Sequence, residues 1–101
     1  MSEVMQARIR WLSPEEGGRP APPVGPRYST VARFEKQRAE WEKEAWSLVV
    51  EWQEPIDAAG WVTANVRFLV PENAPSQLLA VGSRFELMEG RRVVAQGEVV
   101  E

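Results

Sequence analysis

Two glycine-containing turns in this 101-residue chain carry the side chains best suited to binding chemistry. The residues that we single out by type are Arg19 and Arg27 in the first turn and Arg92 beside the second. A guanidinium group presents a planar fork of N–H donors that binds a phosphate or a carboxylate through two parallel hydrogen bonds. Adjacent glycines and several prolines would hold the first turn in a stiff loop. The pattern predicts an anion-binding surface. The alternative is a structural loop whose arginines pair with nearby glutamates or backbone carbonyls.

The composition leaves few groups that can do covalent chemistry. The chain contains no cysteine and no histidine. Thiolate nucleophiles, disulfides, the commonest general base and the commonest metal ligand are therefore missing. Carboxylate pairs such as Glu15-Glu16 occur on any protein surface and give no specific acid–base signal. We therefore expect a protein that is not an enzyme, with no catalytic residues, no metal and no cofactor.

Five tryptophans are many for a chain of this length. Trp11, Trp46 and Trp52 fall on the apolar side of alternating segments, so we expect them to fill a core. Trp61 opens a segment on the face opposite its apolar residues, and Trp41 stands in a charged stretch. We predict that these two are exposed anchors for a partner protein. Base stacking is the alternative, but the glutamates around Trp41 would repel RNA.

The elements that must position these residues have the periodicity of strands. Six strands are predicted within residues 4–12, 28–35, 45–53, 61–70 (the longest) and 84–101. Apolar and polar side chains alternate in most of these segments, and β-branched and aromatic residues are frequent. The last range holds two strands about a tight turn at Glu89-Gly90, which is typical of a hairpin. Six strands without a long helix predict an all-β fold, an antiparallel barrel or sandwich.

Two segments do not fit a strand. Residues 12–28 contain the prolines and glycines of the long loop, and we expect neither helix nor strand there. Residues 35–45 are mostly charged, which favours a solvated turn or hairpin tip; a projecting recognition element is the alternative. Gly97, within the last strand, indicates a bulge or a close approach of another group. The length accommodates a single domain, 1–101.

The charge is unevenly distributed along the chain. The net charge is −3, yet seven basic and four acidic residues precede position 39, and five basic and eleven acidic residues follow. Neighbouring first and last strands would place Arg8 and Arg10 beside Arg91 and Arg92 in a basic stripe. The alternative is a set of solvated arginines facing glutamates. No apolar run suits a signal peptide or a membrane span, so we expect a cytoplasmic protein without membrane contact.

Two stretches resemble the third, C-terminal β-barrel domain of the elongation factor Tu family. The stretch "LSPEEGGRPAPP", followed by "GPR", is similar to the first long loop of that domain. The C-terminal "RFELMEGRRVVAQGEVVE" is similar to its closing hairpin. The middle of the chain matches only as a pattern of strands. The resemblance implies a closed six-stranded antiparallel barrel that does no chemistry. In the family it contacts the GTPase domain, the T-stem of aminoacyl-tRNA and the exchange factor.

The resemblance also implies roles for individual residues. Arg19 corresponds to the loop arginine that approaches the RNA backbone, and Glu89 and Gly90 to the hairpin turn that meets the tRNA stem. Pro20 stands where the family commonly has histidine, and Arg91 where it often has glycine. The chain has no Gly-rich phosphate-binding loop with Lys-Ser/Thr, so we expect neither nucleotide binding nor GTPase activity.

The sequence therefore predicts a non-enzymatic binding module. Our first hypothesis is a translation-associated module that contacts structured, tRNA-like RNA or a translation-related protein. The residues assigned to this contact are Arg19, Arg27, Glu89, Gly90 and Arg92. The alternative is a protein–protein interaction module, such as a decoy or immunity-type partner without RNA binding. It would act through Trp41, Trp61 and the acidic body of the chain. No pattern in the sequence determines the oligomeric state.

Overall fold

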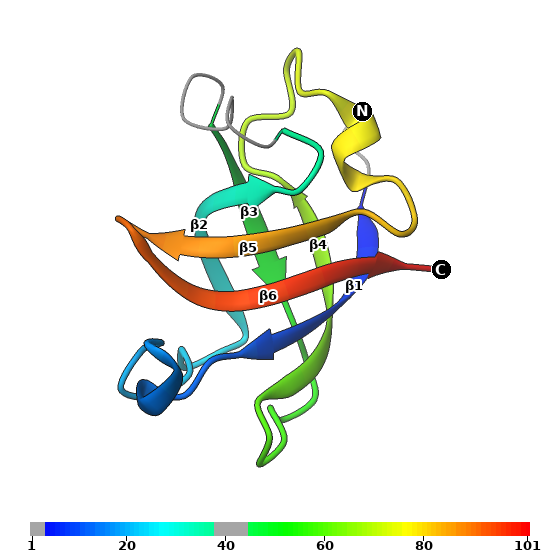
Figure 1. Cartoon of the computed structure of the whole chain (residues 1–101). Coiled ribbons are helices and arrows are strands. Elements are labelled where there is room, and N and C mark those ends of the chain that lie inside the picture. The colour runs from blue at the N-terminus through cyan, green and yellow to red at the C-terminus, as the bar shows by residue number, and fades with distance from the viewer. Residues whose placement is uncertain (1–3, 38–44) are drawn as a thin grey trace.

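The computed structural model describes residues 4–37 and 45–101, and within them six antiparallel strands close into a barrel (Figure 1). The strands are β1 (Met5–Trp11), β2 (Arg27–Phe34), β3 (Trp46–Glu51), β4 (Trp61–Phe68), β5 (Arg84–Glu89) and β6 (Arg92–Val100). Around the barrel their order is β1-β4-β3-β2-β5-β6, and β6 pairs with β1 to close the wall. The predicted all-β fold, a closed six-stranded antiparallel barrel, is confirmed.

Alternation of side chains builds the wall of the barrel. In β1, Ala7, Ile9 and Trp11 are buried, whereas Gln6 and Arg8 are exposed. Successive residues of a strand point to opposite faces, so every strand contributes one inner row to the core. The largest fully buried side chains of this core are Ile9, Phe34, Leu48, Val50, Val66, Leu87, Val94 and Val99. The core therefore fills the barrel along its length.

Aromatic side chains occupy much of the interior, as the sequence predicts. Trp11 and Trp52 are buried, and the partly buried Trp46 packs against the core. The Trp46 ring lies 5.8 Å from the ring of Phe68, and Phe34 lies 6.2 Å from Phe68. Tilted and edge-to-face contacts at such distances are favourable for aromatic pairs. The prediction of a core position is confirmed for Trp11 and Trp52, whereas Trp46 packs against the core from a partly buried position.

The ends of two segments differ from the prediction. β4 ends at Phe68, two residues before the end of the predicted strand at 61–70, and Val70 is 57% exposed. Pro71 follows Val70 and lacks the backbone N–H that continued pairing would need. The longest described strand is thus the nine-residue β6 and not the segment at 61–70. In the long loop, a short 3₁₀ turn, η1 (Pro14–Glu16), forms where no helix was expected.

The β5–β6 hairpin turns one residue later than predicted. Glu89 pairs with Arg92, which leaves Gly90 and Arg91 as the two turn residues. Gly90 has a φ of 63°, a left-handed conformation that tight two-residue hairpin turns require and that glycine adopts easily. The sequence therefore identified the hairpin correctly but not its two central positions.

Gly97 allows a close approach and does not form a bulge. Its partner across the β5–β6 ladder is Phe85, and a Cβ on Gly97 would overlap the Phe85 ring. The irregularity in this ladder lies elsewhere, between Leu87 and Met88, where Val94 on β6 is passed over in the pairing. Of the two roles predicted for Gly97, close approach is the correct one.

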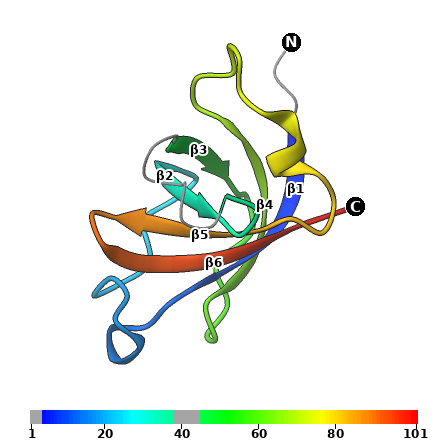
Figure 2. The same cartoon turned by 45° about the horizontal axis from the view of Figure 1, so that its top comes forward.

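The antiparallel topology sorts the connections onto two ends of the barrel. One end, which we call the loop rim, consists of residues 12–26, 52–60 and 90–91 (Figures 1 and 2). The opposite end holds the connection 69–83, with the 3₁₀ turn η3 (Ser76–Leu79), and the start of β1 beside the end of β6. Most of the predicted charged segment 35–45 lies outside the described residues. Its first residues, 35–37, form a turn after β2.

Candidate functional site

The long loop is anchored on an aromatic cluster at the loop rim. The Trp11 ring lies 5.4 Å from Tyr28, nearly perpendicular to it, and 5.9 Å from Trp52. The backbone of Gly25 crosses Trp52 so closely that a Cβ on Gly25 would lie 2.7 Å from the indole Nε1. Pro23, in the same stretch of loop, is buried. The loop is therefore packed onto inner residues of the barrel.

A second anchor ties the start of the loop to β1. Glu16 accepts hydrogen bonds from Nη1 and Nη2 of Arg10, at 3.0 and 2.7 Å, and from the backbone N–H of Ser13 at 3.0 Å. The hydrogen bonds from Arg10, and then that from Ser13, lower the pKa of Glu16 to about 2. This carboxylate stays charged over the whole physiological range and holds η1 against the first strand.

The predicted loop and hairpin residues meet each other. Nη1 of Arg19 forms an ion pair with Oε2 of Glu89, and the hydroxyl of Tyr28 donates a hydrogen bond to the same carboxylate oxygen. Nε of Arg19 also donates to the carbonyl of Ala21 at 3.2 Å, and its guanidinium lies 5.6 Å from the Tyr28 ring centroid. We call these three residues the Arg19–Tyr28–Glu89 cluster. It joins the 12–26 loop to the hairpin.

Each charge in this cluster has a matched partner. Partial burial by itself would raise the pKa of Glu89, but hydrogen bonds from Tyr28 and Arg19, with the positive charges of Arg19 and Arg92, lower it below its ordinary value. Burial, followed by the hydrogen bond to Glu89 and its negative charge, raises the pKa of Tyr28. Near neutral pH the cluster therefore holds a carboxylate, a neutral phenol and a guanidinium. None of the three titrates near pH 7, where a general acid or base works best.

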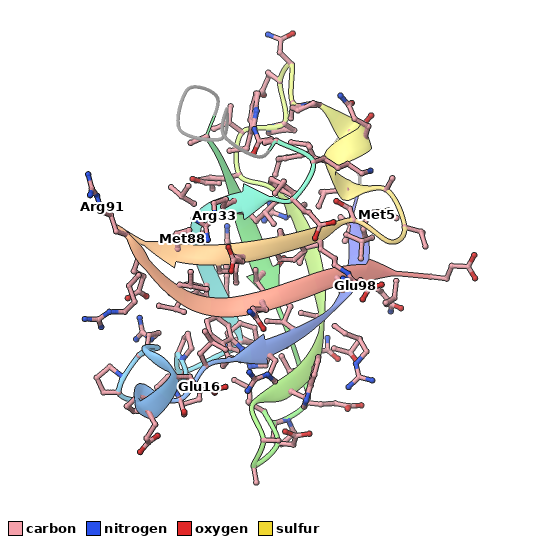
Figure 3. All side chains as sticks on the ribbon, viewed as in Figure 1. Met5, Glu16, Arg33, Met88, Arg91 and Glu98 are labelled. Atoms are coloured by element: carbon pink, nitrogen blue, oxygen red, sulfur yellow. The ribbon has the colours of Figure 1, made fainter. Side chains whose placement is uncertain are left out.

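The other predicted rim residues are exposed. Arg27, Gly90 and Arg92 all lie at or beside the loop rim with exposed side chains or backbone. Arg91, in the hairpin turn, points away from the barrel (Figure 3). No ion pair involves Arg27, Arg91 or Arg92 within residues 4–37 and 45–101. The structure thus brings Arg19 and Glu89 into direct contact and leaves three other arginines open to solvent.

The predicted continuous basic stripe does not form. β1 and β6 are neighbours, as expected, but Arg10 faces Gln96 and is held by Glu16, whereas Arg8 faces Glu98. Arg92 lies four positions nearer to the hairpin turn than Gln96, so it does not stand beside Arg8 or Arg10. Elsewhere on the wall, ion pairs join Arg33 to Glu86, Arg67 to Glu51, and Arg84 to Glu98. The arginines of the wall are therefore interspersed with glutamates, as the alternative to a basic stripe, solvated arginines facing glutamates, predicted.

Trp61 is exposed, as predicted, and has a partner that sequence reasoning missed. Its side chain is 38% exposed on the outer side of β4, and its backbone N–H donates to Oδ1 of Asp57 at 2.8 Å. The guanidinium carbon of Arg8 lies 4.7 Å from the centroid of the Trp61 ring. Tyr28 was also missed, although it directly follows the loop arginine Arg27. Trp41 lies outside the described residues.

Comparisons with known proteins leave the site to be interpreted from its own chemistry. No protein-family model matches the chain, and no curated protein matches it. Among the described residues, no three acidic side chains are grouped so that they could hold a metal ion. The same part of the chain contains no helix that is long and apolar enough to cross a membrane. The exposed arginines, the Arg19–Tyr28–Glu89 cluster and the Arg8–Trp61 pair are therefore the features that a functional proposal must use.

Proposed function

We propose that this chain is a non-enzymatic binding module that contacts structured, tRNA-like RNA through its loop rim. The observation that carries the proposal is the exposure of Arg27, Arg91 and Arg92, which have no ion pair in the described part of the chain. Guanidinium groups with free N–H donors bind phosphate oxygens well. The resemblance of the loop and hairpin sequences to the third domain of elongation factor Tu supports a translation-associated role.

Arg19 has a different role in this proposal from the one expected at first. Its guanidinium is bound to Glu89 and to the carbonyl of Ala21. It would therefore act mainly by holding the loop against the hairpin, so that the exposed arginines stay on one rigid platform. Ordering these elements in the free protein would reduce the entropy lost on binding.

Salt-dependent RNA binding tests the proposal. The affinity of the protein for fluorescein-labelled total tRNA would be measured by fluorescence anisotropy between 50 and 200 mM KCl. The slope of log K against log[salt] is negative. We expect the triple variant R27A/R91A/R92A to reduce the magnitude of this slope by about 2–3, because each phosphate contact contributes about 0.7–0.9. The matched control R33A/R67A/R84A removes the same charge from arginines that already have ion pairs.

Two results would contradict the proposal. One is the absence of tRNA binding by the wild-type protein at 50 mM KCl. The other is an equal loss of affinity in the two triple variants, which would indicate a response to net charge and not to the loop rim.

A further inference from the structure

The outer wall formed by β1, β4 and β6 carries a surface that the RNA proposal does not use. We call it the Trp61 face, and its exposed outward side chains are Gln6, Arg8, Trp61, Thr63, Asn65, Gln96 and Glu98. Except for Arg8 and Glu98, all of these side chains are uncharged. The face lies on paired strands, so its side chains project from a rigid backbone. It is therefore a mainly polar, hydrogen-bonding surface around one aromatic ring, one cation and one carboxylate.

Arg8 contacts the ring of Trp61 and forms no ion pair with the carboxylate that faces it. Glu98 stands directly opposite Arg8 on β6, and Thr63 stands opposite it on β4. The guanidinium nevertheless lies 4.7 Å from the centroid of the Trp61 ring, which is the diagonal neighbour on β4. Long side chains reach such diagonal neighbours in antiparallel sheets, and a guanidinium is attracted to the face of an indole. The contact restrains the side chain while it leaves N–H donors at the guanidinium edge.

The charged groups around Arg8 already have partners. Glu16 binds Arg10, and Glu98 lies 3.9 Å from Arg84. The carboxylate of Asp57 accepts backbone hydrogen bonds from residues 59 and 61, at 2.9 and 2.8 Å. Arg8 itself has no ion pair within the described chain. It is therefore a restrained cation whose hydrogen-bonding edge is open to a ligand.

We propose that Arg8 and Trp61 form a binding site for one carboxylate, an aspartate or glutamate side chain of a partner protein. A guanidinium binds a carboxylate through two parallel hydrogen bonds, and tryptophan and arginine are enriched among the residues that dominate protein interfaces. The surrounding polar amides and hydroxyls would form the rim of such an interface.

The surrounding charges favour a protein over a nucleic acid at this face. RNA presents a phosphate at every nucleotide, so a strand across Arg8 would also approach the carboxylates of Glu98, Glu16 and Asp57. A partner protein can bring one carboxylate to Arg8 without further negative charges beside it, so it meets less of this repulsion than an RNA strand. The site is independent of RNA binding at the loop rim, because none of its residues belongs to that proposal.

Photocrosslinking followed by titration tests this proposal. The chain has no native cysteine, so T63C gives one attachment point for benzophenone maleimide on the Trp61 face. S29C, at an exposed position on β2, is the matched control. Both labelled proteins are irradiated in lysate of the cells that express the chain, with and without nuclease treatment. The protein captured through position 63 alone is purified, and its affinity is measured by calorimetry for the wild type, R8K, R8A and the control R33K, which changes an arginine paired with Glu86.

The proposal predicts a specific pattern of affinities. R8K keeps the charge but loses the two-pronged geometry, so we expect it to bind about tenfold or more weakly, whereas R33K binds like the wild type. Changing the partner's carboxylate to an amide should weaken binding to the wild type and leave binding to R8A unchanged. The proposal is overturned if position 63 captures nothing beyond the control, if capture requires RNA, or if R8K binds as tightly as the wild type.

Discussion

Arg19 and Glu89 form an ion pair across 70 positions of the chain, in which each side chain is about one-third exposed. Each was selected from the sequence as a contact for an external partner, and they prove to be contacts for each other. The pair, with Tyr28, connects the long loop to the hairpin. A partner at the loop rim would therefore meet a preassembled surface and not two independent segments.

The titration of Tyr28 provides the first prediction. It is the only tyrosine in the chain, so absorbance at 295 nm reports on this residue alone. We expect its pKa in the folded protein to lie above the ordinary value of about 10, because burial and the carboxylate of Glu89 disfavour the phenolate. E89Q should lower the pKa, although burial would keep part of the shift. E86Q, which removes a carboxylate bound to Arg33, is the control and should have no effect.

The same group sets the direction of a stability change with pH. A group such as Tyr28, whose pKa is higher in the folded state than in the unfolded state, stabilises the fold at a pH below its unfolded-state pKa. This stabilisation is lost as the pH rises through its folded-state pKa. The wild type should therefore lose more stability than E89Q in urea titrations between pH 9 and 11. Equal losses, or a Tyr28 pKa that is the same in folded and urea-unfolded protein, would contradict the proposed cluster.

The ion pair between Arg10 and Glu16 makes the second prediction. The pKa of Glu16 is about 2, and R10A removes the leading cause of this shift. NMR titration of the side-chain carboxyl carbon should show that the Glu16 pKa rises toward the ordinary value of about 4.3 in R10A. Because the folded pKa is lowered, the stabilisation is present above the unfolded pKa and is lost as the pH falls toward 2. A Glu16 pKa that does not change in R10A would refute the assignment of Arg10 as its cause, and R33A is the charge-matched control.

The contact between Gly25 and Trp52 makes the third prediction. The Cβ of an alanine at position 25 would lie 2.7 Å from Nε1 of Trp52, which is closer than a carbon atom can approach in van der Waals contact. We expect G25A to lower the free energy of unfolding by about 1–3 kcal/mol, the usual cost of overpacking. V24A changes the adjacent residue, which is 94% exposed, and should have little effect. Chemical denaturation of both variants measures the difference, and equal stabilities would show that the loop is not packed on Trp52.

The pairing of Gly97 with Phe85 makes the fourth prediction. G97A should destabilise the barrel by about 1–3 kcal/mol, because the added Cβ would overlap the Phe85 ring. F85L reduces the ring to a smaller side chain and should itself be destabilising, but it should tolerate G97A better. A double-mutant cycle in urea measures this coupling, expected at about 0.5–3 kcal/mol. Strictly additive effects would mean that the two residues do not compete for space.

Several features of the fold could be predicted from local patterns. The alternation around Ile9 and around Leu48 identified strands and their inner faces, because a period of two is set by backbone geometry. The glycine before Arg91 identified the hairpin, although the turn proved to lie one residue later. The end of β4 was missed, because Leu69 and Val70 continue the apolar pattern beyond the last paired inner residue.

The candidate sites were only partly predictable. Residue type singled out Arg19 and Trp61, and the family resemblance singled out Glu89, but neither revealed the partners of these residues. Tyr28 approaches Glu89 because β2 lies beside β5, and Arg8 approaches Trp61 because of the register of β1 against β4. Strand order and register are properties of the whole barrel, and alternation within one segment does not contain them.

The amino-acid sequence by itself determined that this chain forms β-strands with an apolar face and that it contains neither cysteine nor histidine. These properties follow from residue type and from neighbours one or two positions away. Tertiary structure alone decided which charges are neutralised and which stay open, so that Arg19 is bound by Glu89 while Arg91 and Arg8 have no ion pair in the described chain. The reason is physical: charges interact over a few ångströms, and only closure of the barrel sets these distances for residues far apart in the chain.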